Sequence, residues 1–265
     1  MPVPVALPPL AVTAPSPSWQ LGVVLAVLLA IAVTAATIGR LGVRRMQLFA
    51  ALRATGQLAV VSLVITAALR SVWWSAGFAA VMLVVASFTS TRRIRVPLPA
   101  MSLVALAICA GALPVLALIL GSGVIPFNGA GLVPTAGIII GNSMTGATLT
   151  GRRAFDELHH NAGTYEAALA IGMLSPDAAY EVIGPTAREA LIPSIDQTRT
   201  VGLVTLPGAF IGVLLGGGSA VQAGAAQLLV LIGVLAAQAI TASVLLRLVS
   251  YGRLVRTDLA AWYRR

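Results

Sequence analysis

The residues able to do acid–base or metal chemistry are few, and they gather in one part of the chain. Of the 8 acidic residues, all but Asp258 lie between Asp156 and Asp196. The two histidines, His159 and His160, are adjacent, so on a helix their side chains would point about 100° apart, which favours a solvated helix end over a metal site. We find no paired nucleophile and base, which argues against a membrane-embedded enzyme.

A second set of polar residues lies within or at the ends of apolar stretches, where each costs free energy unless it has a partner. The candidates for a translocation path are Arg53, Gln57, Asn142, Met144, Asp196 and Arg199. We expect Arg53 and Asp196 to face the interior of a helix bundle, since neither is stable against lipid tails. The amides of Gln57 and Asn142 also suit hydrogen bonds between packed helices, which is the alternative role. Met144 could be a soft metal ligand, but Met in an apolar span usually packs, so the metal ligands stay unknown.

The chain contains no lysine, because all 17 of its basic residues are Arg. A phosphate-binding P-loop needs a Lys in the pattern GxxxxGK[ST]. This chain therefore cannot hold a standard P-loop, and any ATP and Mg²⁺ would be bound by a separate partner chain. We expect no cofactor on this chain. The excess of Arg favours the cytoplasmic face of a membrane over nucleic acid as its partner.

Composition indicates an integral membrane protein. The 265 residues are 58% hydrophobic and 9% charged, with a mean hydropathy of +0.95, whereas soluble domains are roughly 25% charged. A span needs about 20 mostly apolar residues. The stretches that qualify are Trp19–Gly39, Gln47–Leu69, Val72–Phe88, Leu98–Leu120, Leu132–Thr150, Thr200–Leu215 and Ala225–Val249. We therefore predict an all-α fold of about seven transmembrane helices.

The Arg positions orient these spans. With seven spans, every Arg except Arg70 falls on one side of the membrane, as the positive-inside rule requires for the cytoplasmic side. The N-terminus is then outside and the C-terminus cytoplasmic. We expect a flexible Pro-rich tail at 1–18, a permease domain at 19–252 with a cytoplasmic loop at 152–199, and a basic cytoplasmic tail at 253–265.

The cytoplasmic loop should contain two short helices between residues 164 and 185. Thr164 is a candidate N-cap, and Ser175-Pro176-Asp177 has the residue types that start a second helix. Gly184-Pro185 should end that helix, and Thr186 with Glu189 should form a capping box for the approach to the sixth span. A solvated amphipathic linker is the alternative interpretation.

The spacing in this loop resembles the EAA loop of ABC-transporter permeases. The residues that match the pattern E-A-A-x3-G-x9-I-x-L-P are Glu166, Ala167, Ala168, Gly172, Val182 and Pro185. Val182 stands where that pattern has Ile, and Gly184 where it has Leu. The resemblance implies that a separate P-loop ATPase docks on this loop. The small alanines would permit close approach, and Gly172 a sharp turn.

A second resemblance covers residues from about 40 to 250. The segments "LRATGQLAVVSLVI" (52–65), "GNSMTGATLTGRR" (141–153) and "REALIPSIDQTRTVGLVTLPGAFIG" (188–212) are similar to the FetB permease family, proposed to export iron. Arg199 stands where the family has Lys. The resemblance implies a homodimeric export permease in the plasma membrane, the inner membrane of a bacterium. Pro207-Gly208 would be a hinge in the sixth span.

Two alternatives remain open from the sequence. One is an ABC permease for a non-metal solute, because iron rests on the family resemblance. The other is a secondary transporter, which would be expected to show internal repeats and an ionisable residue at mid-span. The sequence shows neither feature.

Overall fold

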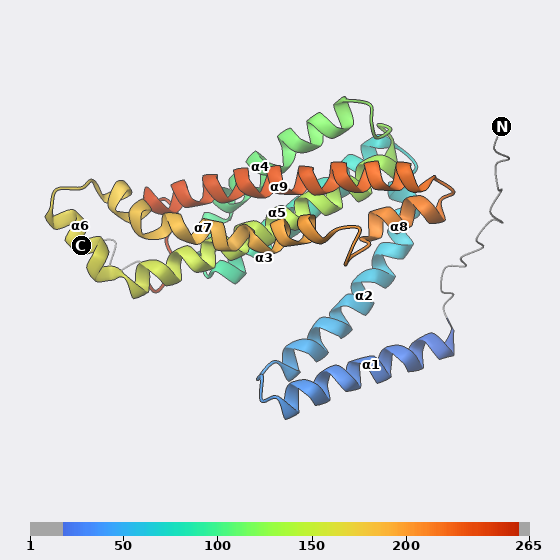
Figure 1. Cartoon of the computed structure of the whole chain (residues 1–265), viewed down its shortest axis with the longest axis horizontal. Coiled ribbons are helices and arrows are strands. Elements are labelled where there is room, and N and C mark those ends of the chain that lie inside the picture. The colour runs from blue at the N-terminus through green and yellow to red at the C-terminus, as the bar shows by residue number, and fades with distance from the viewer. Residues whose placement is uncertain (1–17, 260–265) are drawn as a thin grey trace. The chain divides into compact units, whose positions relative to one another are not determined.

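A computed structural model describes residues 18–259. This part of the chain is helical (Figure 1). Its β-type pairing is limited to an isolated bridge between Val201 and Thr205. The predicted all-α membrane fold is confirmed. The chain divides into two compact units, residues 1–67 and residues 68–265, and each is described by itself.

The first unit is a pair of apolar helices, α1 (Trp19–Ile38) and nearly all of α2 (Arg44–Ala68). The hydroxyl of Ser18 caps α1 by accepting a hydrogen bond from the Leu21 amide at 3.2 Å. Both helices are long and apolar enough to cross a membrane. The predicted tail at 1–18 lies, except for Ser18, outside the described residues.

The second unit is a bundle built around two long helices. Its elements are α3 (Val72–Ile94), η1 (Leu98–Ala100), α4 (Met101–Gly121), α5 (Gly129–His160), α6 (Ala162–Ala170), α7 (Ser175–Thr200), α8 (Gly208–Leu215) and α9 (Ala220–Ser250). Helix α5 packs against α3, α4, α7 and α9, and α9 also packs against α4, α7 and α8 (Figure 1). Helices α5 and α9 are therefore the centre of the bundle.

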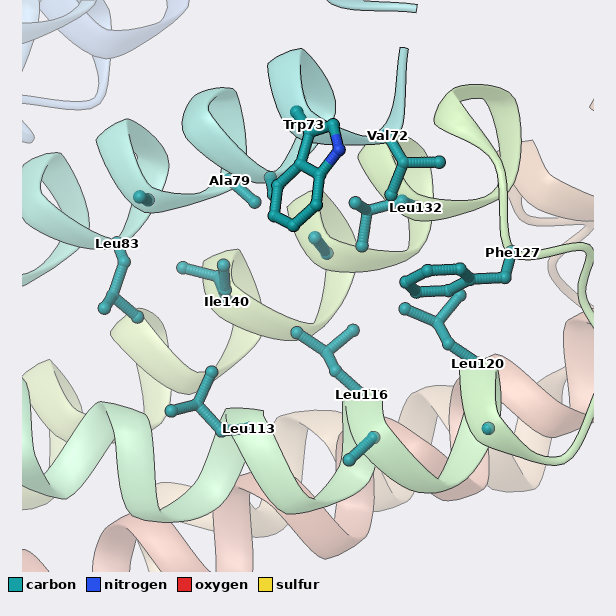
Figure 2. A pocket seen from close by; sticks show the side chains of 15 residues that line it. Val72, Trp73, Ala79, Leu83, Leu113, Leu116, Leu120, Phe127, Leu132 and Ile140 are labelled. Carbon is teal, nitrogen blue, oxygen red and sulfur yellow. The ribbon is translucent and has the colours of Figure 1, made fainter.

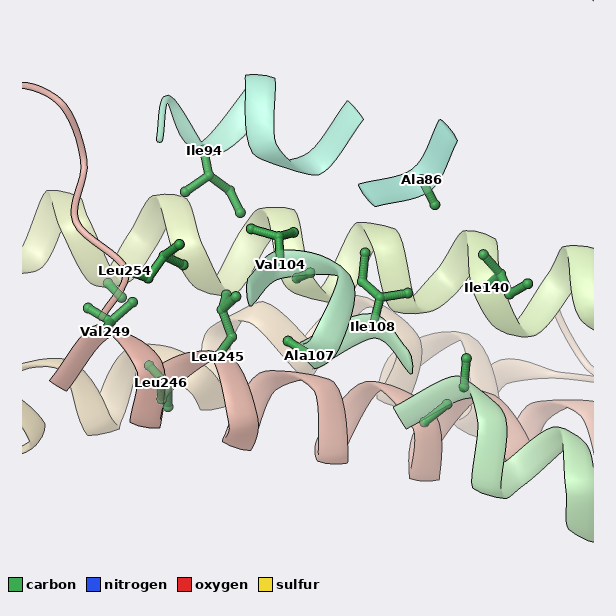
Figure 3. Packing of buried hydrophobic residues seen from close by; sticks show 14 of the residues in the cluster. Ala86, Ile94, Val104, Ala107, Ile108, Ile140, Leu245, Leu246, Val249 and Leu254 are labelled. Atoms are coloured by element: carbon green, nitrogen blue, oxygen red, sulfur yellow. The ribbon is translucent and has the colours of Figure 1, made fainter. Parts of the chain in front are cut away.

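The core of this unit is made mainly of aliphatic side chains, from α3, α4, α5, α7 and α9. Figure 3 shows Ile94 of α3, Ile108 of α4 and Leu245 of α9 turned toward α5. Small residues let the helices approach closely: a Cβ built on Gly111 of α4 would lie 2.2 Å from the Thr241 hydroxyl oxygen of α9. Such close backbone approach is typical of membrane helix packing.

Six helices in the described chain are long and apolar enough to span a membrane, and they match six of the seven predicted spans. The prediction that Thr200–Leu215 forms one helix is wrong. Helix α7 ends at Thr200, Gly202 adopts a left-handed φ of 85°, and a new helix starts only at Gly208. Pro207 supplies no N–H and restricts the residue before it, so a continuous helix is disfavoured there.

The chain returns to the start of α9 in two pieces, α7 and then α8, which both lie along α9 (Figure 1). The sequence prediction missed the part played by α7 because this helix contains Arg188, Glu189, Asp196 and Arg199. Its apolar character is confined to the face that packs on the bundle.

The prediction that a helix ends at Gly184-Pro185 is also wrong, because α7 continues through Pro185 and Pro193 to Thr200. The face formed by Ala178, Ala179, Val182, Ile183, Thr186, Ala190 and Ser194 is buried. Packing along α5 and α9 outweighs the missing proline N–H groups, and the exposed side chain of Pro185 leaves the affected turn accessible to solvent or lipid headgroups.

The predicted helix caps at Thr164, Ser175 and Thr186 also differ from those in the structure. Helix α6 begins at Ala162, so Thr164 lies inside it, and α7 begins at Ser175 with Pro176 and Asp177 in its first turn. Thr186 does not cap a helix, since its hydroxyl donates to the Ile183 carbonyl at 2.6 Å within α7. Local sequence signals for a helix end cannot show that tertiary packing keeps the helix continuous across them.

Candidate functional site

The α6–α7 hairpin, which we define as α6, the turn at residues 171–174 and the first turns of α7, is held by backbone geometry at Gly172. Gly172 has φ 93°, and its amide donates to the Leu169 carbonyl at 2.9 Å. The Met173 amide donates to the Ala168 carbonyl at 3.1 Å, which completes a Schellman motif. A residue with a Cβ is strained at this φ, so the predicted turn at Gly172 is confirmed together with its need for glycine.

A side-chain bond ties the two arms of the hairpin together. The hydroxyls of Tyr165 in α6 and Ser175 in α7 lie 2.7 Å apart, and the Tyr165 side chain is buried. Sequence reasoning did not single out Tyr165. A Tyr just before the Glu-Ala-Ala run of a polar loop was the available signal, since buried tyrosines commonly bond through their hydroxyl.

The tip of the hairpin exposes apolar side chains. Ile171 is 81% exposed and Leu174 is 71% exposed, and the neighbouring Leu169 and Tyr180 are also exposed. Exposed apolar patches on otherwise polar loops mark surfaces that bind a partner. We call Leu169, Ile171, Leu174 and Tyr180 the apolar tip.

The six residues of the predicted coupling motif divide between the surface and the core. Glu166, Ala167 and Pro185 are exposed, and Ala168 is half-buried. Val182 is buried in the main hydrophobic cluster, so it anchors the first turns of α7 to the core of the bundle. The exposed members surround the apolar tip in sequence, and Gly172 sets its turn.

Two polar contacts lie near the end of α5, close to the start of the hairpin. Arg153 of α5 donates to the Glu189 carboxylate of α7 at 2.7 Å. Asn161, at the junction of α5 and α6, donates to the Glu157 carboxylate at 2.6 Å. Both contacts are partly exposed, so each contributes little to stability.

The segment after α9 forms a strap across the same end of the bundle. Within residues 254–259, Leu254 and Leu259 are buried and Arg256 is 8% exposed. Arg256 donates to the Asp156 carboxylate of α5 at 2.5 Å and to Asp258 at 2.7 Å. The amide of Thr257 also donates to the Arg95 carbonyl at 3.3 Å. The predicted basic tail at 253–265 is therefore partly an ordered element, and its residues 260–265 lie outside the described part.

The strap has a charge-dependent contact. The Arg256 guanidinium, by donating a hydrogen bond to the Asp258 carboxylate, lowers the pKa of that carboxyl below its usual value. Asp258 is consequently ionised throughout the neutral range.

Asn142 lies at the junction of α5 and α9 and takes part in two hydrogen bonds there. Its side-chain amide donates to the Ile138 carbonyl of its own helix at 2.8 Å, and its backbone carbonyl accepts from Gln238 at 2.9 Å. The hydrogen bond between helices therefore uses the backbone carbonyl of Asn142 and the side chain of Gln238, and not the Asn142 side chain. The sequence analysis did not identify Gln238. An amide within the apolar last span was the signal that could have identified it.

Several buried oxygens near this junction have no hydrogen-bond partner in the described chain. They are those of Gln238 and Thr241 in α9 and of Ser143 and Thr150 in α5. Native proteins pair most such groups, so a set of unpaired ones needs an explanation. We call Asn142, Ser143 and Gln238 the polar seam between α5 and α9, whereas the Thr241 hydroxyl faces Gly111 of α4.

The seam offers neutral oxygens and no ionisable ligand. Among residues 18–259, no group of three or more His, Cys, Asp or Glu could hold a metal ion. Met144 packs against the hydrophobic cluster, while its carbonyl accepts from Ser90 at 3.1 Å and from Thr148 at 2.8 Å.

The charged path candidates lie on exposed surfaces. The prediction that Asp196 faces the bundle interior is wrong for a single chain, because its side chain is 56% exposed and pairs with Arg199 at 3.5 Å. Arg53 and Gln57 are exposed on α2 within the first unit. Pro207 and Gly208 form the entry to α8, so they link two helices rather than kink one.

Comparison with known proteins gives consistent matches. A family model described as "Uncharacterised protein family (UPF0014)" matches residues 19–254. The chain is 32% identical to "UPF0014 membrane protein STAR2" of Oryza sativa subsp. japonica over 204 residues, which cover 76% of this chain and 72% of that protein. It is 31% identical to "Protein ALUMINUM SENSITIVE 3" of Arabidopsis thaliana over 57% of this chain and 55% of the relative.

A bacterial relative carries a more specific name. The chain is 34% identical to "Probable iron export permease protein FetB" of Escherichia coli over 125 residues, 47% of this chain and 48% of that protein. No solved structure matches the chain.

Proposed function

Because this chain belongs to the UPF0014 membrane protein family, we propose that it is the membrane-spanning subunit of an ABC exporter driven by a separate ATPase. The observation that carries the proposal is the α6–α7 hairpin with its exposed apolar tip. The absence of lysine from the chain supports the requirement for a partner that binds ATP.

The hairpin has the mechanical properties of a coupling element. Gly172 and the Tyr165–Ser175 bond make it a fixed shape instead of a flexible linker. Its second arm is the start of α7, a helix of 26 residues that packs along both α5 and α9. Movement of an ATPase bound to the tip would therefore displace α7 as a rod, relative to the two central helices.

A second copy of the chain is part of the proposal. Asp196 and Arg199 lie on the exposed side of α7, where lipid would penalise their charges. A twofold contact between two copies of α7 would cover both residues and place them beside a path at the interface. Closed twofold symmetry is the commonest arrangement of homo-oligomers.

A metal ion is the substrate that the relatives favour. One relative is named for iron export and another for aluminium sensitivity. The oxygen atoms of the polar seam suit hard cations, and the lack of charged ligands there suits release over storage. The same lack of ligands favours a second candidate, export of an uncharged polar solute that hydrogen-bonds the seam.

Docking of the ATPase is tested by charging the apolar tip. Ile171→Glu should abolish stimulation of a co-purified P-loop ATPase, because a carboxylate cannot be buried in an apolar contact without a partner. Val124→Glu is the matched control, since Val124 is also an exposed apolar residue outside helices, at the other end of the bundle.

ATP hydrolysis in proteoliposomes, and the amount of ATPase retained on purification, are the measurements. Retention and stimulation at the wild-type level in Ile171→Glu would contradict docking at the tip. Addition of Fe²⁺, Fe³⁺ or Al³⁺ to the working complex then tests the substrate class: stimulation by none of them would favour the uncharged solute.

A further inference from the structure

The second unit contains a large apolar groove between α3, α4 and α5. Its volume is about 970 Å³, and its walls include Leu83, Leu113, Phe127 and Ile140. Figure 2 shows these side chains pointing into one space, with Trp73 at its edge. Every residue that lines it is aliphatic, aromatic or glycine, so it offers no oxygen ligand to a metal ion. The groove is therefore separate from the polar seam in its chemistry.

The length of the groove corresponds to one leaflet of a bilayer. Along α3 it runs from Trp73 to Leu83, which is about 15 Å at 1.5 Å per residue. The hydrocarbon core of a membrane is about 30 Å thick, so half of it is about the same length. Trp73 and Trp74, both largely exposed, occupy the end of α3 where interfacial aromatics are expected.

A positively charged residue, Arg70, lies two residues before Val72, where α3 begins to line the groove. Its side chain is exposed. The other connections at this end, residues 122–128 and 216–219, contain no charged residue. An exposed guanidinium above an apolar groove is complementary to a lipid phosphate above an acyl chain.

We propose that this groove binds one glycerophospholipid of the surrounding bilayer, with its phosphate at Arg70 and an acyl chain between α3, α4 and α5. The acyl chain would fill the apolar space that the three helices leave between them. It would exchange more slowly than lipids on the outer surface, because three helices contact it.

The test uses the full chain in liposomes of phosphatidylethanolamine and phosphatidylglycerol, with a trace of phosphatidylglycerol carrying a photoreactive diazirine in its acyl chain. Crosslinked peptides are identified by mass spectrometry. We expect labelling of the groove walls at Leu113 to exceed labelling at Ile232 of α9 by about tenfold, although the two side chains are almost equally exposed, at 53% and 55%.

Filling the groove should remove that excess. Ala117→Trp places a large side chain in the groove from an exposed position, so folding should be preserved. Its labelling at Leu113 should fall to the level at Ile232. The control Ala236→Trp, also at an exposed alanine, should leave the groove signal unchanged. Arg70→Gln should lower the signal without changing labelling of α9.

Three results would overturn the proposal. Equal labelling of Leu113 and Ile232 in the wild-type chain would show ordinary surrounding lipid. A disulfide between cysteines introduced at Ala79 and on α2, with no lipid label, would show that the chain's own segment fills the groove. A disulfide from Ala79 to a second copy would show a protein interface instead.

Discussion

Gly172 is the residue on which the α6–α7 hairpin depends most directly. Its φ of 93° is closed to most L-residues, and its amide is one of the two that complete the turn. An ideal Cβ at this position would meet no atom within 4 Å. Any penalty for substitution therefore comes from the backbone and not from crowding.

Replacing Gly172 should separate backbone strain from side-chain size. Gly172→Val should destabilise the turn by about 1–2 kcal/mol, because β-branched residues avoid left-handed φ values. Hydrogen exchange of the amides at 168–175 should accelerate, and ATPase coupling should fall, with membrane insertion intact.

Gly172→Asn is the matched comparison, since Asn enters the left-handed region more readily than Val, so its exchange should lie between those of wild type and Gly172→Val. If Val and Asn gave the same exchange rates, strain at this φ would not be what holds the hairpin.

At the scale of elements, the strap at 254–259 joins parts of the chain far apart in sequence. Through Arg256 and Thr257 it connects the end of α9 to Asp156 of α5 and to Arg95 after α3. It lies at the end of the bundle from which the hairpin projects. The strap thus restrains three helices where force from an ATPase would enter.

The pH dependence of the strap follows from Asp258. Its pKa is lowered in the folded chain by the hydrogen bond from Arg256. The resulting stabilisation is fully present above the unfolded pKa, about 3.9, and is lost as the pH falls through the lower folded value. Hydrogen exchange of residues 254–259, corrected for its intrinsic pH dependence, should be constant from about pH 5 to 8 and increase only below about pH 4.

The substitution Arg256→Ala should release the strap at every pH, because it leaves Asp156 and Asp258 facing each other without a cation. Arg253→Ala is the control at an exposed Arg of the same segment. Release of the wild-type strap between pH 5 and 8 would contradict the role given to Asp258.

At the scale of the whole molecule, the proposed second copy would cover the exposed charged side of α7. A twofold contact at this face predicts that a cysteine at Ile192 meets its copy. In a Cys109→Ser background, which removes the only native cysteine, Ile192→Cys should crosslink to a dimer under mild oxidation.

Ile232→Cys is the matched control, because it is a similarly exposed isoleucine on α9, and it should remain monomeric on a denaturing gel. Crosslinking of both positions, or of neither while light scattering shows a monomer, would contradict a specific α7 interface.

Much of this architecture follows from composition and charge. Six apolar helices and the turn at Gly172 could be predicted because each depends on the residues of one short segment. The uneven distribution of Arg could be read in the same way, because it is a count over segments. The motif from Glu166 to Pro185 located the hairpin even though the end predicted for its second helix was wrong. The lack of lysine excludes a standard P-loop whatever the fold, because the phosphate-binding pattern needs that residue type.

Tertiary structure alone decided where the polar residues lie and how residues 175–215 are arranged. Packing on α5 and α9 carries α7 through Pro185 and Pro193, which no local propensity predicts. The same packing turns Asp196 outward, buries Val182, and brings Gln238 to the Asn142 carbonyl across 96 positions of sequence. These outcomes depend on which faces of distant helices meet, and that choice is made by the sum of many contacts instead of by any one stretch of residues.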